Sequence, residues 1–393
     1  MRMCAACLMV LVALVAGSVA CAQPEVSRAT YEHPIAGFSL ELPEDWEMGM
    51  GDLGNVVIAL DADAGPGTCT LFPMLWFFYA SAPPQQMAAE IAQALNALDH
   101  SSPAVQEGAN GEYIVAATSR GPRGAIVEEW HCRQEGGRSY VLASMVKPEF
   151  QAQFADDLAH AFRTCRLIPR VPVTLFTEPT ENAYRMVLPA DWQWSGRIIR
   201  TPEIPGYFEW LVASPDGLTG AFSSPPGVFN VMLPYMPAGT AAEEIVLPGL
   251  REKLPDARLE AVHELPRPGA YYSGLIRAIG LGANPQVHKV RADYVGTRNG
   301  VRVRVRANVA TMMLDASPLL GGRGNWTLLT SGYWAPEDQF DELGPVGRSA
   351  LASLMTDPTF KRNQFEAGNE VAVWSAWNRE LSFWRFMLRL WSN

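Results

Sequence analysis

Apolar and polar residues alternate over residues 38–42 and again over residues 184–188. In both places the sequence reads Leu-Pro-x-Asp-Trp from the last alternating residue onward. Alternation with a period of two predicts a strand with one buried face, and the proline ends the strand because it has no N–H to donate. The two segments begin 146 residues apart, so we expect two copies of one domain.

Periodicity after the first of these segments predicts a series of strands and helices. Met87, Ile91, Leu95 and Leu98 recur at spacings of four, four and three, which is typical of a helix with one apolar stripe. The strongly apolar segment at 68–79 predicts a long central strand. We expect strands at 56–60, 68–79, 111–118, 125–133 and 139–146, and helices at 83–98 and 149–165.

The second segment is followed by the same order of elements with longer loops. Thr240 and Glu243 have the spacing of a capping box, which predicts a helix that begins at Thr240. Asn299-Gly300 is a strong signal for a two-residue hairpin turn. We expect strands at 207–213, 228–235, 271–279, 287–295 and 301–313, and a last helix that carries Val346, Ala350, Leu351 and Leu354.

Length and composition agree with this division of the chain. The 393 residues exceed the roughly 250–300 residues that one hydrophobic core supports. Hydrophobic residues make up 48% and charged residues 18%, which is typical of a globular protein. The last helices of the two copies lie 186 residues apart, so about forty extra residues, including 315–325, lie in the loops of the second copy. We expect domains at 23–169 and 170–364.

The order of these elements resembles a known family. An apolar residue, Gly-Phe, an alternating strand and Leu-Pro-x-x-Trp, followed by three strands, a helix, four strands and a helix, resemble the PsbP-like fold, although the second copy has Ala183-Tyr184 in place of Gly37-Phe38. The resemblance covers both copies. It implies an α+β protein of two tandem domains, each an antiparallel sheet flanked by helices in an α/β/α sandwich. Members of the family share non-enzymatic binding or support tasks, so the resemblance carries no catalytic residue to this chain.

The first 22 residues have the pattern of a secretory signal peptide. A basic residue precedes the apolar stretch at 8–16, which is too short for a membrane span of about 20 residues. Alanines on both sides of Cys21 form an A-x-A cleavage site, so we expect cleavage near Ala22 and a secreted or periplasmic protein. The alternative is a bacterial lipoprotein acylated at Cys21, although Ser18 stands where such sequences usually carry a bulky aliphatic residue.

Removal of residues 1–22 takes away one Arg and no acid, which leaves 30 basic and 41 acidic residues and a net charge of −11. This charge excludes non-specific nucleic-acid binding. Three cysteines remain, Cys69, Cys132 and Cys165, without metal-ligand spacing. In an oxidising compartment they allow one disulfide in any of three pairings, and burial as free thiols is the alternative.

The mature sequence lacks G-x-S-x-G, H-E-x-x-H, P-loop and C-x-x-C motifs. The five histidines after residue 50 are isolated from one another, and we expect each to have a structural or surface role. The sequence therefore predicts no catalytic residue, no metal site, no cofactor and no enzymatic activity.

Arg302, Arg304 and Arg306 alternate with valines, which places three guanidinium groups on one face of a single strand. Such a face could bind an anion or an acidic partner. The alternative interpretation is a solvated strand face whose arginines are paired with acids such as Asp293 on a neighbouring strand.

Residues 365–393 form a Trp-rich tail. Its apolar residues follow spacings of three, four, three, four and three, which predicts an amphipathic helix, and its charged residues argue against a transmembrane span. The helix could pack on the second domain, pair with another chain, or lie on a membrane surface. The residues of the stripe are Trp374, Trp377, Leu381, Trp384, Leu388 and Trp391.

These patterns favour a non-enzymatic binding or accessory protein of the bacterial envelope whose ligand or partner is unknown. The alternatives are an enzyme with a site between the domains and a peripheral membrane protein attached through its C-terminal helix. An enzyme should bring titratable residues together in one cleft, whereas a binding protein should have an apolar or basic concave patch.

Overall fold

The structure is a computed structural model. It describes residues 27–44, 46–50, 56–59, 73–97, 103–121, 124–199, 207–225, 227–229, 235–265, 286–313, 326–357 and 359–360. The expected signal peptide at 1–22, Cys69, the expected strand at 271–279, the expected insertion at 315–325 and the Trp-rich tail lie outside these residues.

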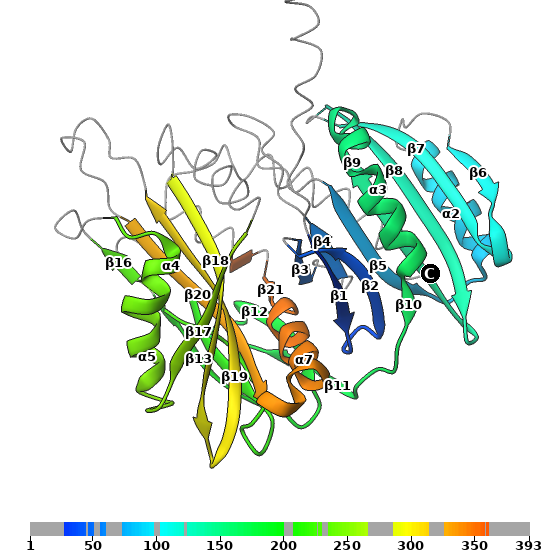
Figure 1. Cartoon of the computed structure of the whole chain (residues 1–393). Helices are drawn as coiled ribbons and strands as arrows, with labels where there is room; N and C mark the ends of the chain where they lie inside the picture. The colour runs from blue at the N-terminus through cyan, green and yellow to red at the C-terminus, as the bar shows by residue number, and fades with distance from the viewer. Residues whose placement is uncertain are drawn as a thin grey trace, which may run out of the picture.

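The described residues of the two expected domains, 23–169 and 170–364, each contain one large sheet, and these parts are called the first and the second domain. The first contains a seven-stranded antiparallel sheet in the order β3-β4-β5-β9-β8-β7-β6. Helices α2 (Pro84–Ala97) and α3 (Pro148–Thr164) pack on its two faces, which gives two separate core clusters (Figure 1). The strands are β3 (Glu47–Met50), β4 (Val56–Ala59), β5 (Met74–Ala80), β6 (Ala104–Glu107), β7 (Tyr113–Gly121), β8 (Gly124–Glu135) and β9 (Arg138–Val146).

A small sheet of β1 (Arg28–His33), β2 (Phe38–Pro43) and β10 (Arg166–Leu167) completes this domain. The hydroxyl of Tyr31 lies 2.9 Å from the carbonyl oxygens of both Pro43 and Trp46. Trp46 is 2% exposed and packs in the same cluster as β2. Leu42 and Pro43 thus end β2, and Trp46 packs back against that strand.

The second domain has a sheet in the order β13-β14-β15-β20-β19-β18-β17, with β16 paired to β20, and a small sheet in the order β11-β12-β21. One face is covered by α4 (Ala238–Ala241), the π-helical turn η2 (Ala242–Val246) and α5 (Leu247–Arg251), and the other by α7 (Phe340–Ala352). Its strands are β11 (Val173–Thr177), β12 (Tyr184–Pro189), β13 (Gln193–Ile199), β14 (Tyr207–Ala213), β15 (Gly220–Ser223), β16 (Gly227–Phe229), β17 (Arg258–Glu264), β18 (Gln286–Arg298), β19 (Val301–Met313), β20 (Trp326–Pro336) and β21 (Met355–Thr356).

The two large sheets have the same order of strands. In each sheet the first three strands are followed in space by the last strand, and the remaining three run in reverse sequence order. The short 3-10 helices η1 (Ala109–Gly111) and η4 (Glu337–Gln339) lie in connections. The structure is thus α+β with mainly antiparallel sheets, as the sequence predicted.

The prediction of a capping box at Thr240 was wrong. The helix begins at Ala238, so Thr240 lies inside its first turn, and the N-cap residue Pro237 makes no side-chain hydrogen bond to it. The cap comes from a distant residue, because the backbone N–H of Ala238 donates to Nδ1 of His288, 2.8 Å away on β18.

Two strand predictions differ from the structure in their bounds. The central strand β5 begins at Met74 and not at residue 68, and residues 60–72 before it are not described. The strand expected at 228–235 is represented by β16, Gly227–Phe229, and residues 235–237 are not in a strand.

The two domains are in contact along β1, α7 and β18. Ile35, in the turn between β1 and β2, is 1% exposed and belongs to the hydrophobic cluster of the second domain. The guanidinium group of Arg348, on α7, lies 4.0 Å from the centroid of the Tyr31 ring. Arg291 of β18 pairs with Glu44 at 2.9 Å. Figure 1 shows α7 between the second sheet and β1.

Candidate functional site

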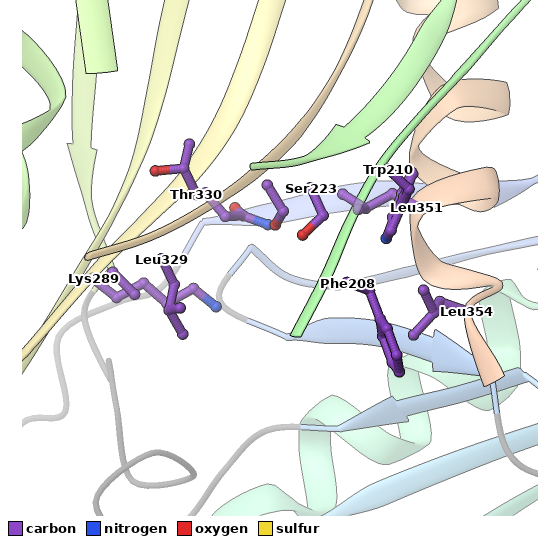
Figure 2. Close-up of a pocket in the computed structure, with 11 residues that line it drawn as sticks. Phe208, Trp210, Ser223, Lys289, Leu329, Thr330, Leu351 and Leu354 are labelled. Carbon is purple, nitrogen blue, oxygen red and sulfur yellow. The ribbon is translucent and has the colours of Figure 1, made fainter. Parts of the chain in front are cut away.

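A pocket of about 330 Å³ lies on the α7 side of the second sheet, where α7 ends. Its wall combines aromatic and aliphatic side chains with a few polar groups, as is common in small-molecule sites. Figure 2 shows Lys289 on one side of the pocket and Phe208, Trp210, Leu351 and Leu354 on the other. The lining residues are Phe208, Trp210, Ser223, Lys289, Asn308, Ala310, Leu329, Thr330, Ser331, Leu351 and Leu354.

The register of the strands explains the arrangement of the polar groups. Asn308 of β19 is paired with Ser331 of β20, which is paired in turn with Ser223 of β15. Paired residues share a face of the sheet, so an amide and two hydroxyl groups form one row across three strands. Trp210 of β14, the partner of Ser223, extends this row with an aromatic ring.

The next row of the sheet supplies the charge. Lys289 of β18 is paired with Ala310 of β19, which is paired with Leu329 of β20. Lys289 is 5% exposed, and burial alone lowers its pKa to about 8. It is the one charged residue among the described residues that line the pocket.

The basic residue nearest in sequence on the same face of β18 is Arg291, which is engaged elsewhere. One of its terminal nitrogens donates to a carboxylate oxygen of Glu44, in the first domain, at 2.9 Å. Burial raises the pKa of Glu44, but the hydrogen bond from Arg291 outweighs this effect, so the pKa lies below its usual range. The pocket thus lies beside an ion pair that joins the two domains.

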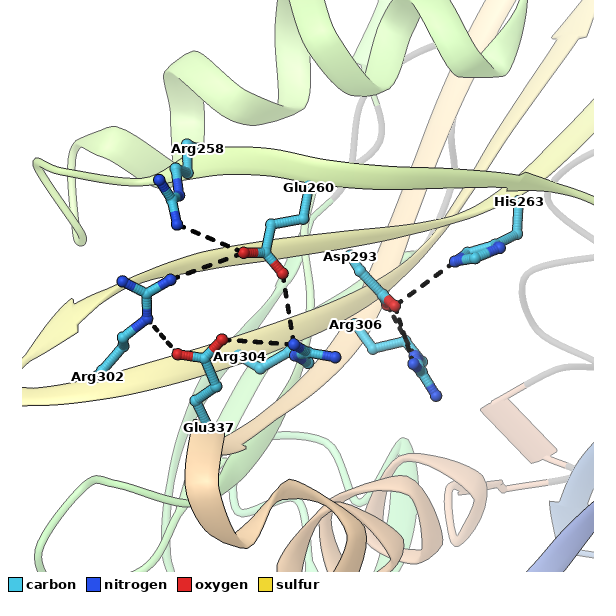
Figure 3. Close-up of polar contacts among 8 residues, drawn as sticks. All are labelled: Arg258, Glu260, His263, Asp293, Arg302, Arg304, Arg306 and Glu337. Atoms are coloured by element: carbon cyan, nitrogen blue, oxygen red, sulfur yellow. Dashed lines mark hydrogen bonds and ion pairs between the residues drawn. The ribbon is translucent and has the colours of Figure 1, made fainter.

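Arg302, Arg304 and Arg306 of β19 are paired with carboxylates, which is the second of the two interpretations of this row (Figure 3). Arg306 donates two hydrogen bonds to the carboxylate of Asp293, at 2.7 and 2.8 Å. Arg302 and Arg304 both contact Glu260 and Glu337, with Arg304 3.4 Å from an oxygen of each. The three guanidinium groups therefore face carboxylates and do not form an open basic surface.

Burial distinguishes the members of this row. Burial raises the pKa of Asp293, but the hydrogen bonds from Arg306 outweigh it, so that the carboxyl group has a lowered pKa. The Arg302 side chain is 52% exposed, and ion pairs at that exposure contribute little to stability. The pairing agrees with the alternative interpretation of this row, and an anion site at Arg302, Arg304 and Arg306 stays an untested prediction. Their carboxylate partners lie on β17, β18 and η4, so the sequence of β19 alone does not identify these partners.

A second polar cluster lies in the first domain, at β8. The ring nitrogens of His131 lie 2.6 Å from Glu112 and 2.7 Å from Glu129, and the ring stacks on Phe162 at 3.7 Å. Burial lowers the pKa of His131, but hydrogen bonds to the two carboxylates outweigh it and raise the pKa overall. Arg133 pairs with Glu112 and donates to the Phe162 carbonyl oxygen. The contacts of His131 and Arg133 with Phe162 hold α3 against the sheet.

Cys132 and Cys165 are free and buried. Cys132 packs with α2 and Cys165 with α3, on opposite faces of the sheet, so the pairing of these two cysteines is absent. Burial raises the pKa of each thiol to about 12. The two pairings with Cys69 lie outside the described residues.

Among the residues that the structure describes, no group of three or more His, Cys, Asp or Glu side chains could hold a metal ion. A search of the same residues finds no helix that is long and apolar enough to cross a membrane. The tail residues Trp374, Trp377, Leu381, Trp384, Leu388 and Trp391 are not among them, so the three arrangements of the tail stay predictions.

Sequence reasoning missed the pocket, since its lining comes from β14, β15, β18, β19, β20 and the end of α7. The sequence carries no clear signal for it, because Lys289 alternates with Val290 and falls on the same face of the strand as Arg291 and Asp293, which is the ordinary place for a charged residue.

No family profile matches this chain, and neither does any curated protein sequence. Several solved structures resemble it at low sequence identity, and three of them are described here. LpqN of Mycobacterium tuberculosis, involved in cell envelope biogenesis, is 12% identical over 37% of this chain and 92% of its own, with a TM-score of 0.26. Cyanobacterial PsbP (CyanoP) of Synechocystis is 8% identical over 48% of this chain and 94% of its own, with a TM-score of 0.22.

The third is the immunity protein TplEi of the type VI secretion system of Pseudomonas aeruginosa. It is 13% identical over 86% of this chain and 99% of its own, with a TM-score of 0.22. These likenesses assign no function to the chain.

Proposed function

We propose that the protein is a non-enzymatic binding protein of the bacterial envelope and that the pocket beside α7 is its binding site. One observation supports this proposal. The pocket has about 330 Å³, two aromatic side chains of β14 on one side, aliphatic side chains from the end of α7, and a short row of neutral hydrogen-bonding groups. A recess of this size and lining suits a small molecule that is held by apolar contact and oriented by a few polar groups.

The proposed architecture is two tandem copies of a PsbP-like unit, at 23–169 and 170–364, followed by an amphipathic helix at 365–393. The repeated Leu-Pro-x-Asp-Trp segment and the equal order of strands in the two large sheets support the duplication. The described pocket lies in the second copy.

The proposed location is secreted or periplasmic, on the basis of the signal-peptide pattern at 1–22. Mass spectrometry of the exported protein tests this. A mature chain that begins at Gln23 is the expected result, an acylated Cys21 would establish the lipoprotein alternative, and a chain that retains residues 1–22 would contradict export.

The binding function is tested with N-phenylnaphthylamine, a neutral apolar probe whose fluorescence rises on binding. We expect saturable binding of one probe per chain. Ser331→Phe should abolish it, because a phenyl ring at the centre of the polar row fills the pocket. Ser195→Phe is the matched control, since Ser195 is an exposed residue of β13 outside the pocket.

Circular dichroism shows whether each variant is folded. A second blocking variant, Leu354→Trp, covers the case in which Ser331→Phe does not fold. Absence of saturable binding by the wild-type protein, or equal binding by the wild type and both blocking variants, would overturn the proposed site.

A second candidate function, an enzyme whose site lies beside the domain contact, is favoured by the lowered pKa of Lys289. A lysine of pKa about 8 in an apolar recess has a larger neutral fraction near pH 7 than a surface lysine and can add to a carbonyl group. The imine that forms with loss of water is reduced by borohydride to a stable amine. A borohydride-trapped adduct of benzaldehyde on Lys289, absent in Lys289→Met, would favour the enzyme over the binding protein.

A further inference from the structure

We infer that the open edge of β13 is a contact surface for a second copy of this chain. In the inferred dimer, two β13 strands pair in antiparallel direction about a two-fold axis at Gly196, so that one sheet continues from one chain into the next. The contact is separate from the pocket beside α7, whose described lining includes no residue of β13.

Strand β13 has one paired edge and one open edge. All its residues, Gln193–Ile199, pair with β14, and no strand among the described residues pairs with its other edge. Ser195, Gly196 and Arg197, in the middle of the strand, are exposed. The backbone N–H and C=O groups along this edge can therefore pair with a strand of another chain.

The edges that β3, β6 and β17 form in the two large sheets have features that protect an edge from such pairing. β3 and β6 have four residues each, and β3 is in contact with α7. β17 has an irregular register between Leu259 and Ala261 and carries several charged side chains. β13 has seven residues in continuous register, without proline or lysine. It is therefore the edge of these sheets that is best suited to pairing with another strand.

The centre of β13 is complementary to itself in an antiparallel pair. When Gly196 is opposite Gly196, Trp194 of one chain is opposite Ile198 of the other, and Ser195 is opposite Arg197. These central pairs match apolar with apolar and polar with polar on both sides of the two-fold axis. No like charges are directly opposite, because Arg197 is the one charged residue of β13. This complementarity favours a second copy of the chain as the partner.

Trp194 supplies the apolar centre of the contact. Its ring stacks on Phe176 of β11, with 4.6 Å between the ring centroids, and its Nε1 donates to the Tyr184 hydroxyl oxygen at 3.2 Å. A Cβ atom at Gly196 would lie 2.9 Å from this ring, so the ring lies over the middle of the strand. Trp194 and Ile198 are partly exposed in the single chain. Because Trp194 is already held in place, it loses little conformational freedom when a second copy covers it.

The charge of β13 offers a way to detect the pairing. Arg197 pairs with Glu209 of β14, and the Arg197 side chain is 70% exposed. In the inferred dimer, residue 195 of one chain lies directly opposite Arg197 of the other. A charge introduced at residue 195 is therefore attracted or repelled by that arginine, according to its sign.

Substitutions of opposite charge at residue 195 test the inference. Sedimentation velocity of the purified protein over a range of concentrations measures the dissociation constant of the dimer for the wild type, Ser195→Glu and Ser195→Arg. Gln106→Glu and Gln106→Arg are the matched controls, because Gln106 is an exposed residue of another edge strand, β6. Circular dichroism shows whether each variant is folded.

We expect the wild type to reach the mass of two chains with a dissociation constant in the micromolar range, because one pair of strands is a small interface. Ser195→Glu should tighten the dimer by about two- to thirtyfold and Ser195→Arg should weaken it by about the same factor, because the two-fold axis repeats each new charge pair. The two controls should leave the dissociation constant unchanged. A general effect of charge has the opposite sign, since the chain has a net charge of −10 and an added arginine lowers the repulsion between chains.

A wild-type protein that stays monomeric at about 100 µM, well above the micromolar range of a small interface, would overturn the inferred contact. A dimer that responds equally to Ser195→Glu and Ser195→Arg, or to neither, would also overturn it, because such a dimer uses another surface. If one of these variants does not fold, the other still gives a change of predicted sign. None of these results bears on the binding of N-phenylnaphthylamine, which tests the proposed function separately.

Discussion

His33 makes the contact between the two domains sensitive to acid. It is fully buried at the end of β1, its Nδ1 accepts the Ala36 N–H at 3.1 Å, and its Nε2 has no hydrogen-bond partner among the described residues. Burial, with the positive charge of Arg348 as a smaller contribution, lowers the pKa of His33 from 6.5 to about 3. The turn that His33 begins carries Ile35 into the second domain.

The loss of unfolding free energy on acidification follows from the difference between the pKa of His33 in the folded state and its pKa in the unfolded state. Because the folded state keeps His33 neutral, the unfolded state binds the additional proton as the pH falls below about 6.5. The stability contributed by the neutral side chain is complete above that pH and is lost on acidification. At about 1.36 kcal/mol per unit, the loss is about 2 kcal/mol at pH 5 and approaches about 5 kcal/mol near pH 3.

The assay is urea unfolding of the full chain at pH 7.5 and pH 5, with the wild type and His33→Asn. The Asn carboxamide oxygen can accept the Ala36 N–H but does not titrate. Ile35→Ala is a second variant that destabilises the same turn without removing the histidine. We expect the wild type and Ile35→Ala to lose about 2 kcal/mol more between the two pH values than His33→Asn does. The reasoning is refuted if all three lose the same amount.

Four further predictions follow from the same structure. Ile35→Ala should lower the unfolding free energy by about 2–4 kcal/mol at pH 7.5, the cost of emptying a buried aliphatic site, and a loss below 1 kcal/mol would contradict its anchoring role. Arg306→Met should lower the unfolding free energy by about 3 kcal/mol, because it leaves the buried carboxylate of Asp293 without its arginine partner. Arg302→Met should lower it by less than about 1 kcal/mol, because Arg302 is exposed. Equal losses for the two variants in urea unfolding would contradict this difference in burial. Since burial lowers the pKa of Lys289 to about 8, borohydride trapping of benzaldehyde on Lys289 should increase as the pH rises through that value, and a flat profile would contradict the lowered pKa. Deletion of residues 369–393 should leave vesicle flotation and the mass from light scattering unchanged, because aromatic stripes at helical spacing usually pack in a core, and release from vesicles or dissociation of an oligomer would contradict this.

The sequence predicted correctly those strands, turns and helices that depend on residues close together in the chain. The strand β19 has the predicted bounds, and the Asn299-Gly300 turn before it has both residues at positive φ, 51° and 78°, as a two-residue hairpin requires. Met87, Ile91 and Leu95 are buried along one face of α2, as their spacing predicted. These features depend on neighbours within a few residues, and the sequence displays such neighbours directly.

Features that depend on distant residues escaped prediction. The cap of the helix at Ala238 is His288, the partners of the arginine row are Glu260, Glu337 and Asp293, and the pocket is assembled from five strands and the end of one helix. Alternation places Lys289 on a face of β18 but does not say what covers that face. The register between strands decides this, and register follows from the whole sheet.

Fluorescence titration of N-phenylnaphthylamine with the wild-type protein and with Ser331→Phe tests the central claim most directly. The account predicts saturable binding of one probe per wild-type chain and none for the folded variant. Equal binding by both proteins, or none by either, would contradict a binding site in the pocket beside α7.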